Sequence, residues 1–160
     1  MNAKTLDRQK KFHHAKKVQD GCRDVLRKKF PKLEDHTENR RKMDWRNPET
    51  GEAIEFKCVD LARYGGFTIS QEKVDLYLND VRNSPDTEFG SFWIVDSMTG
   101  EEYRLQLSVI ESLIRTGIIK PRKNRKSREQ HESGIFYCVP IKYLTNITNA
   151  THSLSSYITL

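Results

Sequence analysis

Residues 44–59 constrain the fold of this chain more than any other segment. Within them, residues 47–51 (N-P-E-T-G) favour a turn, and residues 53–59 (A-I-E-F-K-C-V) alternate apolar and polar side chains. Because successive side chains of a strand point to opposite faces, Glu55 and Lys57 would share one face, while the apolar side chains enter a core on the other. The segment therefore predicts a β-hairpin with one charged face.

The predicted hairpin brings a second acid to that charged face. Its turn folds Asp44 back beside Glu55, so that two carboxylates and the amine of Lys57 converge. An ion pair between Glu55 and Lys57 on a solvent-facing strand, worth under about 1 kcal/mol, also accounts for the E-x-K triplet. It does not account for an aspartate at hairpin distance, so we interpret the three residues as a candidate site.

The rest of the chain predicts helices and strands around this hairpin. Apolar residues spaced by three and four predict a basic amphipathic helix over residues 4–30, which Pro31 ends. Gly65 and Gly66 mark a tight or flexible connection, and Pro140 favours a sheet edge for the strand that contains it. The other predicted elements are a polar loop at 32–42, a short strand at 43–45, a helix from Ser70 to 83–86, strands at 91–96 and 102–107, a short helix capped by Ser108 and closed by Gly117, a basic loop at 120–131, a last strand at 134–144 and a loose tail at 145–160.

This order of elements predicts the fold class. We expect one domain over residues 1–160, in the α/β (α+β) class, with a mixed central β-sheet flanked by helices and a catalytic core at residues 43–114. The chain contains no internal repeat.

Composition and charge exclude several classes of protein. The chain has no apolar run long enough to span a membrane, and its three cysteines are too few and too scattered for a disulfide framework or a zinc motif. The net charge is +8 over residues 1–42 (14 basic, 6 acidic), −7 over residues 43–107 (6 basic, 13 acidic) and +5 over residues 108–160 (8 basic, 3 acidic). A basic shell around an acidic centre suits a protein that grips a polyanion and holds a cation, and an ordinary solvated surface has the same composition.

The spacing of Asp44, ten further residues and then Glu55-Phe56-Lys57 resembles the D-x(n)-(D/E)-x-K signature of the PD-(D/E)XK nuclease superfamily. The order of elements is similar too, over about residues 5–114. The closing strand (V-P-I-K-Y-L) and the size of the chain are similar to those of small type II restriction endonucleases. Met43 stands in the position of the signature's proline, which often varies. The resemblance implies a restriction-endonuclease-like fold.

The resemblance also implies metal-dependent hydrolysis of a phosphodiester. Asp44, Glu55 and the backbone carbonyl of Phe56 would hold Mg²⁺, or alternatively Mn²⁺, because hard cations prefer oxygen ligands. The metal would activate a water and neutralise charge on the phosphate, while Lys57 would position or deprotonate that water or screen the phosphate. Asp44, Glu55 and Lys57 are thus the expected catalytic residues. Five other acids are open as a third ligand: Asp20, Asp24, Glu34, Asp35 and Glu38.

Two segments carry candidate DNA contacts. The resemblance implies that the DNA runs beside the segment after the catalytic strand, which contains Arg63, Tyr64, Thr68 and Ser70. The basic loop would clamp a phosphate backbone or enter a groove. Its basic residues are Lys120, Arg122, Lys123, Arg125, Lys126 and Arg128. A disordered charged loop is the alternative interpretation of these residues.

We therefore expect a metal-dependent endonuclease that cuts double-stranded DNA at specific sites, as a restriction or homing enzyme. Two alternatives remain open: a structure-selective nuclease of the Holliday-junction-resolvase kind, and a non-catalytic nucleic-acid-binding module. To cut both strands of a symmetric site, so small a chain would form a homodimer or a higher homo-oligomer. Because no signal-peptide pattern opens the sequence, we expect a cytoplasmic protein that acts on host DNA away from membranes.

Overall fold

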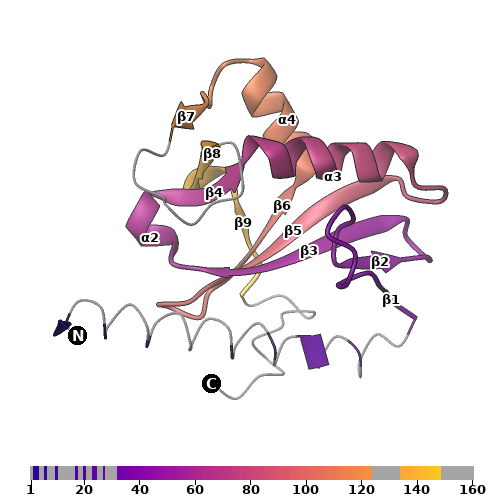
Figure 1. Ribbon diagram of the computed structural model, residues 1–160, viewed down its shortest axis with the longest axis horizontal. Coiled ribbons are helices and arrows are strands. Elements are labelled where there is room, and N and C mark those ends of the chain that lie inside the picture. The colour runs from indigo at the N-terminus through magenta and orange to yellow at the C-terminus, as the bar shows by residue number, and fades with distance from the viewer. Residues whose placement is uncertain are drawn as a thin grey trace.

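A six-stranded mixed β-sheet runs through the computed structural model of the chain (Figure 1). The structure describes residues 32–123 and 134–148, together with positions 2, 3, 6, 10, 17, 20, 23, 24 and 27. The strand order is β1-β2-β3-β5-β6-β9. Its strands are β1 (Glu34–Asp35), β2 (Trp45–Asn47), β3 (Glu52–Val59), β5 (Phe89–Asp96), β6 (Glu102–Gln106) and β9 (Thr145–Asn146).

The central pair of strands, β3 and β5, is parallel, and the other pairs of this sheet are antiparallel. Parallel neighbours need a crossover connection, and here it consists of α2 (Leu61–Tyr64), β4 (Gly66–Ser70) and α3 (Gln71–Asn83). The described part of the chain is therefore a mixed sheet with flanking helices, and the predicted α/β (α+β) class is confirmed. The restriction-endonuclease-like fold stays a prediction.

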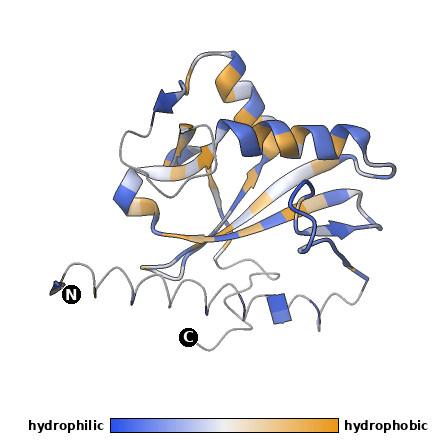
Figure 2. Cartoon of the chain, in the orientation of Figure 1, coloured by the Kyte–Doolittle hydropathy of each residue, from blue (hydrophilic) through white to orange (hydrophobic). Residues whose placement is uncertain are grey.

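A second, three-stranded antiparallel sheet has the order β4-β8-β7, with β7 at Arg122–Lys123 and β8 at Ile135–Pro140. Helix α4 (Leu107–Arg115) follows β6 directly, and a 3₁₀ turn at Ile141–Tyr143 follows β8. Figure 1 shows α3 and α4 over one face of the main sheet, with β4 joining α2 to α3. Hydrophobic and hydrophilic residues alternate along both helices (Figure 2), as expected of helices with one face in a core.

Apolar side chains pack in two clusters, and β3 contributes side chains from one face to each of them. The larger cluster joins Ala53 and Phe92 to side chains of the helices and the second sheet, among them Leu107 and Phe67. The smaller cluster contains Trp45, Ile54, Phe56, Trp93 and Val95, with Cys58 packed against it. The predicted alternation along β3 is therefore confirmed, because its even-numbered apolar side chains lie together in one core.

Several predicted elements agree with the structure. The strands predicted at 53–59, 91–96 and 102–107 correspond to β3, β5 and β6, each within two residues at either end. Ser70 is the N-cap of α3, and its hydroxyl oxygen accepts a hydrogen bond from the Lys73 backbone N–H at 3.2 Å. The predicted helix over 4–30 falls mostly outside the described residues, and the loop residues 124–131 fall entirely outside them. The single described positions between 3 and 27 are helical.

Two predictions about the C-terminal half are wrong. Gln106, and not Ser108, is the N-cap of α4, because the buried Leu107 already belongs to the helix's apolar face. Strand β8 is the middle strand of its sheet and not an edge strand. It tolerates Pro140 because this residue ends the strand, where a missing N–H interrupts no interior hydrogen bond.

Short strands occur where the sequence suggested loops or a tail. Two-residue strands lie within the segments expected as loops, and β4 begins at Gly66, the second glycine of the pair. The last predicted strand ends at 140 and not 144. Residues 145–146, expected in a loose tail, form β9 and pair with β6. None of the described helices is both long and apolar enough to cross a bilayer.

The tight connection after α2 generates a stability prediction. A Cβ added to Gly66 would overlap the backbone carbonyl oxygen of Val139, whereas a Cβ on Gly65 would meet no atom within 4 Å but would sit at a φ of +73°. We expect Gly66→Ala to lower the free energy of unfolding by about 2–4 kcal/mol, because backbone must move. Gly65→Ala, the control, should cost about 1–2 kcal/mol for the left-handed conformation alone. Urea denaturation measures both, and equal losses would contradict the close strand contact.

Candidate active site

The three side chains singled out in the sequence lie together in the structure. Glu55 is in the middle of β3, and Asp44 lies just before β2, opposite it in the hairpin. The Asp44 backbone N–H donates to Glu55 Oε2 at 2.9 Å, and Lys57 Nζ lies 3.1 Å from Glu55 Oε1. The hairpin therefore brings two carboxylates and an amine to one place.

Glu55 is the most buried member of this group, with 4% of its surface exposed. Besides Lys57 and the Asp44 N–H, it is bound by Tyr77 of α3, whose hydroxyl donates to Oε1 at 2.9 Å. A buried carboxylate needs such donors to keep its charge. Lys57, by contrast, has 37% of its side chain exposed, so its amine lies between the buried acid and solvent.

The carboxyl group of Asp44 has a raised pKa. Burial first, and then the neighbouring Glu55 charge, raise the pKa of its carboxyl from the ordinary value to about 6. The positive charges of Lys57 and Arg23 and the Phe56 backbone N–H, which bonds the Asp44 side chain, oppose that rise in pKa. Two acids are thus held close together without enough positive charge to balance both.

Tyr77 and Arg23 are site residues that sequence reasoning missed. Tyr77 belongs to the apolar stripe of its helix, so its spacing predicted a core residue, and only the structure turns its hydroxyl toward Glu55. Arg23 was one of many basic residues on the predicted first helix. It is half-buried, and its buried Nε has no hydrogen-bond partner among the described residues. No spacing signal distinguishes it from its neighbours in the sequence.

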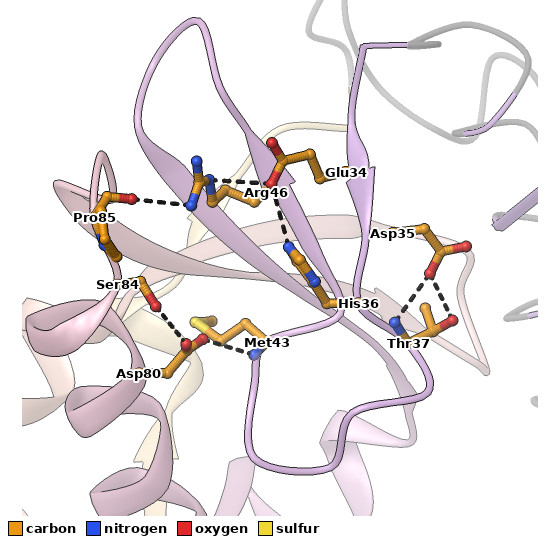
Figure 3. A network of polar contacts seen from close by, with 9 residues as sticks. All are labelled: Glu34, Asp35, His36, Thr37, Met43, Arg46, Asp80, Ser84 and Pro85. Atoms are coloured by element: carbon orange, nitrogen blue, oxygen red, sulfur yellow. Dashed lines mark hydrogen bonds and ion pairs between the residues drawn. The ribbon is translucent and has the colours of Figure 1, made fainter.

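Helix α3 also holds the chain just before Asp44 (Figure 3). The Met43 backbone N–H donates to Asp80 Oδ2 at 2.9 Å, and the Ser84 hydroxyl donates to Asp80 Oδ1 at 2.8 Å. The Asp44 carbonyl in turn accepts from the His36 N–H at 2.8 Å. Because Asp80 lies one helical turn after Tyr77, one face of α3 fixes both Glu55 and the approach to Asp44.

The oxygen atoms of this site suit a hard divalent cation. In an extended strand, the N–H and C=O of one residue point to the same side, so the Phe56 carbonyl faces the side on which its N–H meets Asp44. Two carboxylates and a carbonyl are ligands that Mg²⁺ accepts together with several waters. Glu55 has about four acceptor positions and uses three in the bonds above, which leaves one.

None of the acids considered as a third ligand joins this site. Within the described residues, no three His, Cys, Asp or Glu side chains form a metal-binding group. Glu34 Oε2 lies 3.3 Å from His36 Nε2 and 3.4 Å from Arg46 Nε, and Asp35 is bound to Arg27 at 3.0 Å. Asp20, Asp24 and Glu38 are exposed.

The residues predicted to contact DNA lie apart from the two acids, on α2 and the second sheet. Arg63 and Tyr64 are exposed on α2, with the guanidinium 5.3 Å from the tyrosine ring centre. Thr68 and Ser70 lie on β4, half-buried. Three basic residues of the loop are described and exposed: Lys120, Arg122 and Lys123. The other three lie outside the described residues: Arg125, Lys126 and Arg128.

Comparison with known proteins gives one structural likeness. No protein-family model matches the sequence, and no curated protein matches it. Among solved structures the chain is similar to D212, a nuclease from a fusselovirus, with 16% sequence identity, a TM-score of 0.44, and 98% of this chain and 95% of that chain covered. The function proposed below rests on the chemistry of this chain's own residues.

The protonation of Asp44 generates a prediction about stability. Since its pKa of about 6 lies above the ordinary 3.8, its contribution to the free energy of unfolding is full below about pH 4 and is lost as pH rises to about 6. Without divalent ions at pH 8, Asp44→Asn should therefore be more stable than the wild type by about 1–3 kcal/mol, and at pH 4 the two should match. Urea denaturation across pH measures this. Asp75→Asn, at an exposed position of α3, is the control, and a variant that is less stable at pH 8 would refute the strained pair of acids.

Proposed function

We propose that this protein is a nuclease, and specifically a magnesium-dependent endonuclease that hydrolyses phosphodiester bonds in double-stranded DNA. The observation that supports this most is the convergence of Asp44, Glu55 and Lys57, with the Phe56 carbonyl on the same side. A solvated ion pair does not require a buried glutamate with three donors, nor an aspartate whose pKa is raised to about 6. Such groups favour a site that is completed by a further cation.

Asp44, Glu55 and the Phe56 carbonyl would hold the divalent ion, Mg²⁺ or in its place Mn²⁺. When bound, the ion would supply a water of lowered pKa and positive charge beside the scissile phosphate. Lys57 Nζ, half-exposed next to Glu55, would donate hydrogen bonds to the attacking water or to a phosphate oxygen. Tyr77 and the Asp44 N–H hold the Glu55 carboxyl group in its orientation, because each donates to one of its oxygens.

The charge of the exposed residues supports a nucleic-acid substrate. A phosphodiester chain is a polyanion, and the predicted DNA contacts Arg63, Lys120, Arg122 and Lys123 are exposed and basic. Cleavage at specific sites, as by a restriction or homing enzyme, would need two active sites to cut both strands, and hence a homodimer or a higher homo-oligomer. Such an enzyme would act inside the cell, where DNA is found.

Cleavage of long duplex DNA tests this function. Incubated with Mg²⁺, the protein should convert genome-length DNA into discrete fragments, and chelation of the ion should stop the reaction. Cleavage confined to branched junctions would indicate a structure-selective nuclease, and the absence of cleavage would indicate a binding module without catalysis.

The amine of Lys57 gives a sharper test. Lys57→Ala should lower the cleavage rate about 10²–10⁴-fold, because a positioned donor near the reacting atoms is lost. Lys32→Ala, which removes an amine that is bound to Glu49 and 76% exposed, is the matched control and should cleave at the wild-type rate. A Lys57→Ala protein with full activity would remove lysine from the mechanism. Cleavage assays under Mg²⁺ saturation measure both.

Tyr77 is expected to act by orienting Glu55. Tyr77→Phe should lower the free energy of unfolding by about 1–2 kcal/mol and slow cleavage, because Glu55 loses one donor. Tyr103→Phe removes a similar bond, from the tyrosine hydroxyl to Glu101 Oε2 at 2.7 Å, elsewhere in the sheet. This control should lose stability without losing kcat once the protein is folded. Equal rates for the two variants would show that Tyr77 has only a structural role.

A further inference from the structure

The β4-β8-β7 sheet has one face in the core and one face turned away from it. Phe67, Ile69, Tyr137 and Val139 alternate onto the buried face, and the Phe67 ring lies 5.1 Å from that of Phe92 in the main sheet. The residues between them are half-buried and belong to the opposite face, which we call the outer face. Its members are Thr68, Ser70, Phe136 and Cys138.

The strand register extends the outer face to β7. Ser70, Phe136 and Arg122 are cross-strand neighbours, so the three side chains form one row on this face. Burial raises the pKa of the Cys138 thiol, and the nearby positive charge of Arg122 opposes that rise in pKa, which agrees with Arg122 reaching along the outer face. Lys123 pairs with Ile135 and therefore points to the opposite face.

Helix α2 borders the other end of the outer face. The Cys138 thiol donates to the Tyr64 carbonyl at 3.4 Å, which fixes the helix beside this face. Arg63 stacks against the Tyr64 ring, and that ring is 56% exposed. An arginine therefore stands near each end of the outer face, with hydroxyl and aromatic side chains between them.

The segments that form this face are basic on balance. Residues 61–70, 117–123 and 134–148, which contain α2 and the strands of the second sheet, have five Lys or Arg and no Asp or Glu, whereas residue 60 and residues 124–133 add three Lys or Arg and three Asp or Glu. The strand length between the α2 end and the Arg122 row, from Gly66 to Ser70, is about 13 Å at 3.3 Å per residue. That length is comparable with the width of the major groove of B-DNA, about 12 Å.

The outer face is also connected to the candidate active site. Ser70 caps α3, and Lys73 in the first turn places its amine 5.7 Å from the Tyr77 ring centre. Tyr77 in turn bonds Glu55. Ser70 of the outer face therefore caps the helix whose Tyr77 hydroxyl bonds Glu55.

We propose that duplex DNA docks on the outer face of the β4-β8-β7 sheet, with Arg63 and Arg122 on the phosphates that border one groove and Thr68 and Phe136 facing the groove between them. This inference rests on the proposed function, because it takes the same DNA as its ligand. It narrows the predicted contacts, since Lys123 lies on the wrong face to take part.

Binding without cleavage tests the docking face. Fluorescence anisotropy with a labelled duplex in a chelating buffer measures the Kd of the full-length protein over a range of salt concentrations. Arg122→Ala and Arg63→Ala should each weaken binding about 10-fold and each reduce the slope of log K against log salt by about 0.9, the value for one lost phosphate contact. Thermal unfolding of each variant checks that the fold is kept, and Arg122→Lys should recover most of the slope.

Lys123→Ala is the matched control, because it removes one positive charge from the same strand on the opposite face. It should change Kd less than about twofold. An equal loss for Lys123→Ala and Arg122→Ala, unchanged binding in both arginine variants, or a wild type that binds no duplex would each overturn the docking face. If the wild type cleaves DNA and both arginine variants bind it with the wild-type Kd, the docking face is refuted and the proposed active site is retained. If the two arginine variants bind more weakly, Lys123→Ala binds normally and no protein cleaves DNA, the docking face is supported and the nuclease function is refuted.

Discussion

The carboxylate of Glu55 is the point on which the candidate site depends. It is buried at the centre of the sheet, and its two oxygens accept from the Tyr77 hydroxyl, the Lys57 amine and the Asp44 backbone N–H. These donors come from α3, β3 and the segment before β2. A single buried charge therefore ties together the hairpin and the helix that follows it, and the positions of Asp44 and Lys57 are set relative to it.

The arrangement around this carboxylate lowers the stability of the fold in order to place two acids side by side. Burial, together with the neighbouring Glu55 carboxylate, raises the pKa of Asp44 to about 6, although a well-packed apolar pair would fold more easily. Asp80 supports the segment before Asp44 by accepting from the Met43 N–H, and the Ser84 hydroxyl donates to Asp80. Helix α3 therefore does more than cover the sheet, since its side chains hold an electrostatically unfavourable pair in place.

Much of the fold was predictable where one periodicity dominated. The alternation in β3, the strand at β5 and the cap at Ser70 agree with the structure because local pattern and burial favour the same conformation there. Short strands such as β7 and β9 exist only through pairing with distant segments, so no local signal announces them. The edge position predicted from Pro140 was wrong for the same reason. Pro140 ends a central strand because it pairs with Gly66, far away in the sequence. In the site, the hairpin was predictable from spacing, whereas Tyr77 and Arg23 required the tertiary arrangement.

The parallel pairing of β3 and β5 has a consequence for how the protein comes to be active during synthesis. The crossover between these strands contains α3, and the bonds that position the acids span 22 residues from Glu55 to Tyr77 and 37 residues from Met43 to Asp80. Contacts so distant in sequence form only after a long loop has closed. A chain still emerging from the ribosome can form the hairpin, but it lacks Tyr77 and Asp80, whose hydrogen bonds hold Glu55 and the segment before Asp44. The order of synthesis thus delays any activity of this site until the crossover is complete.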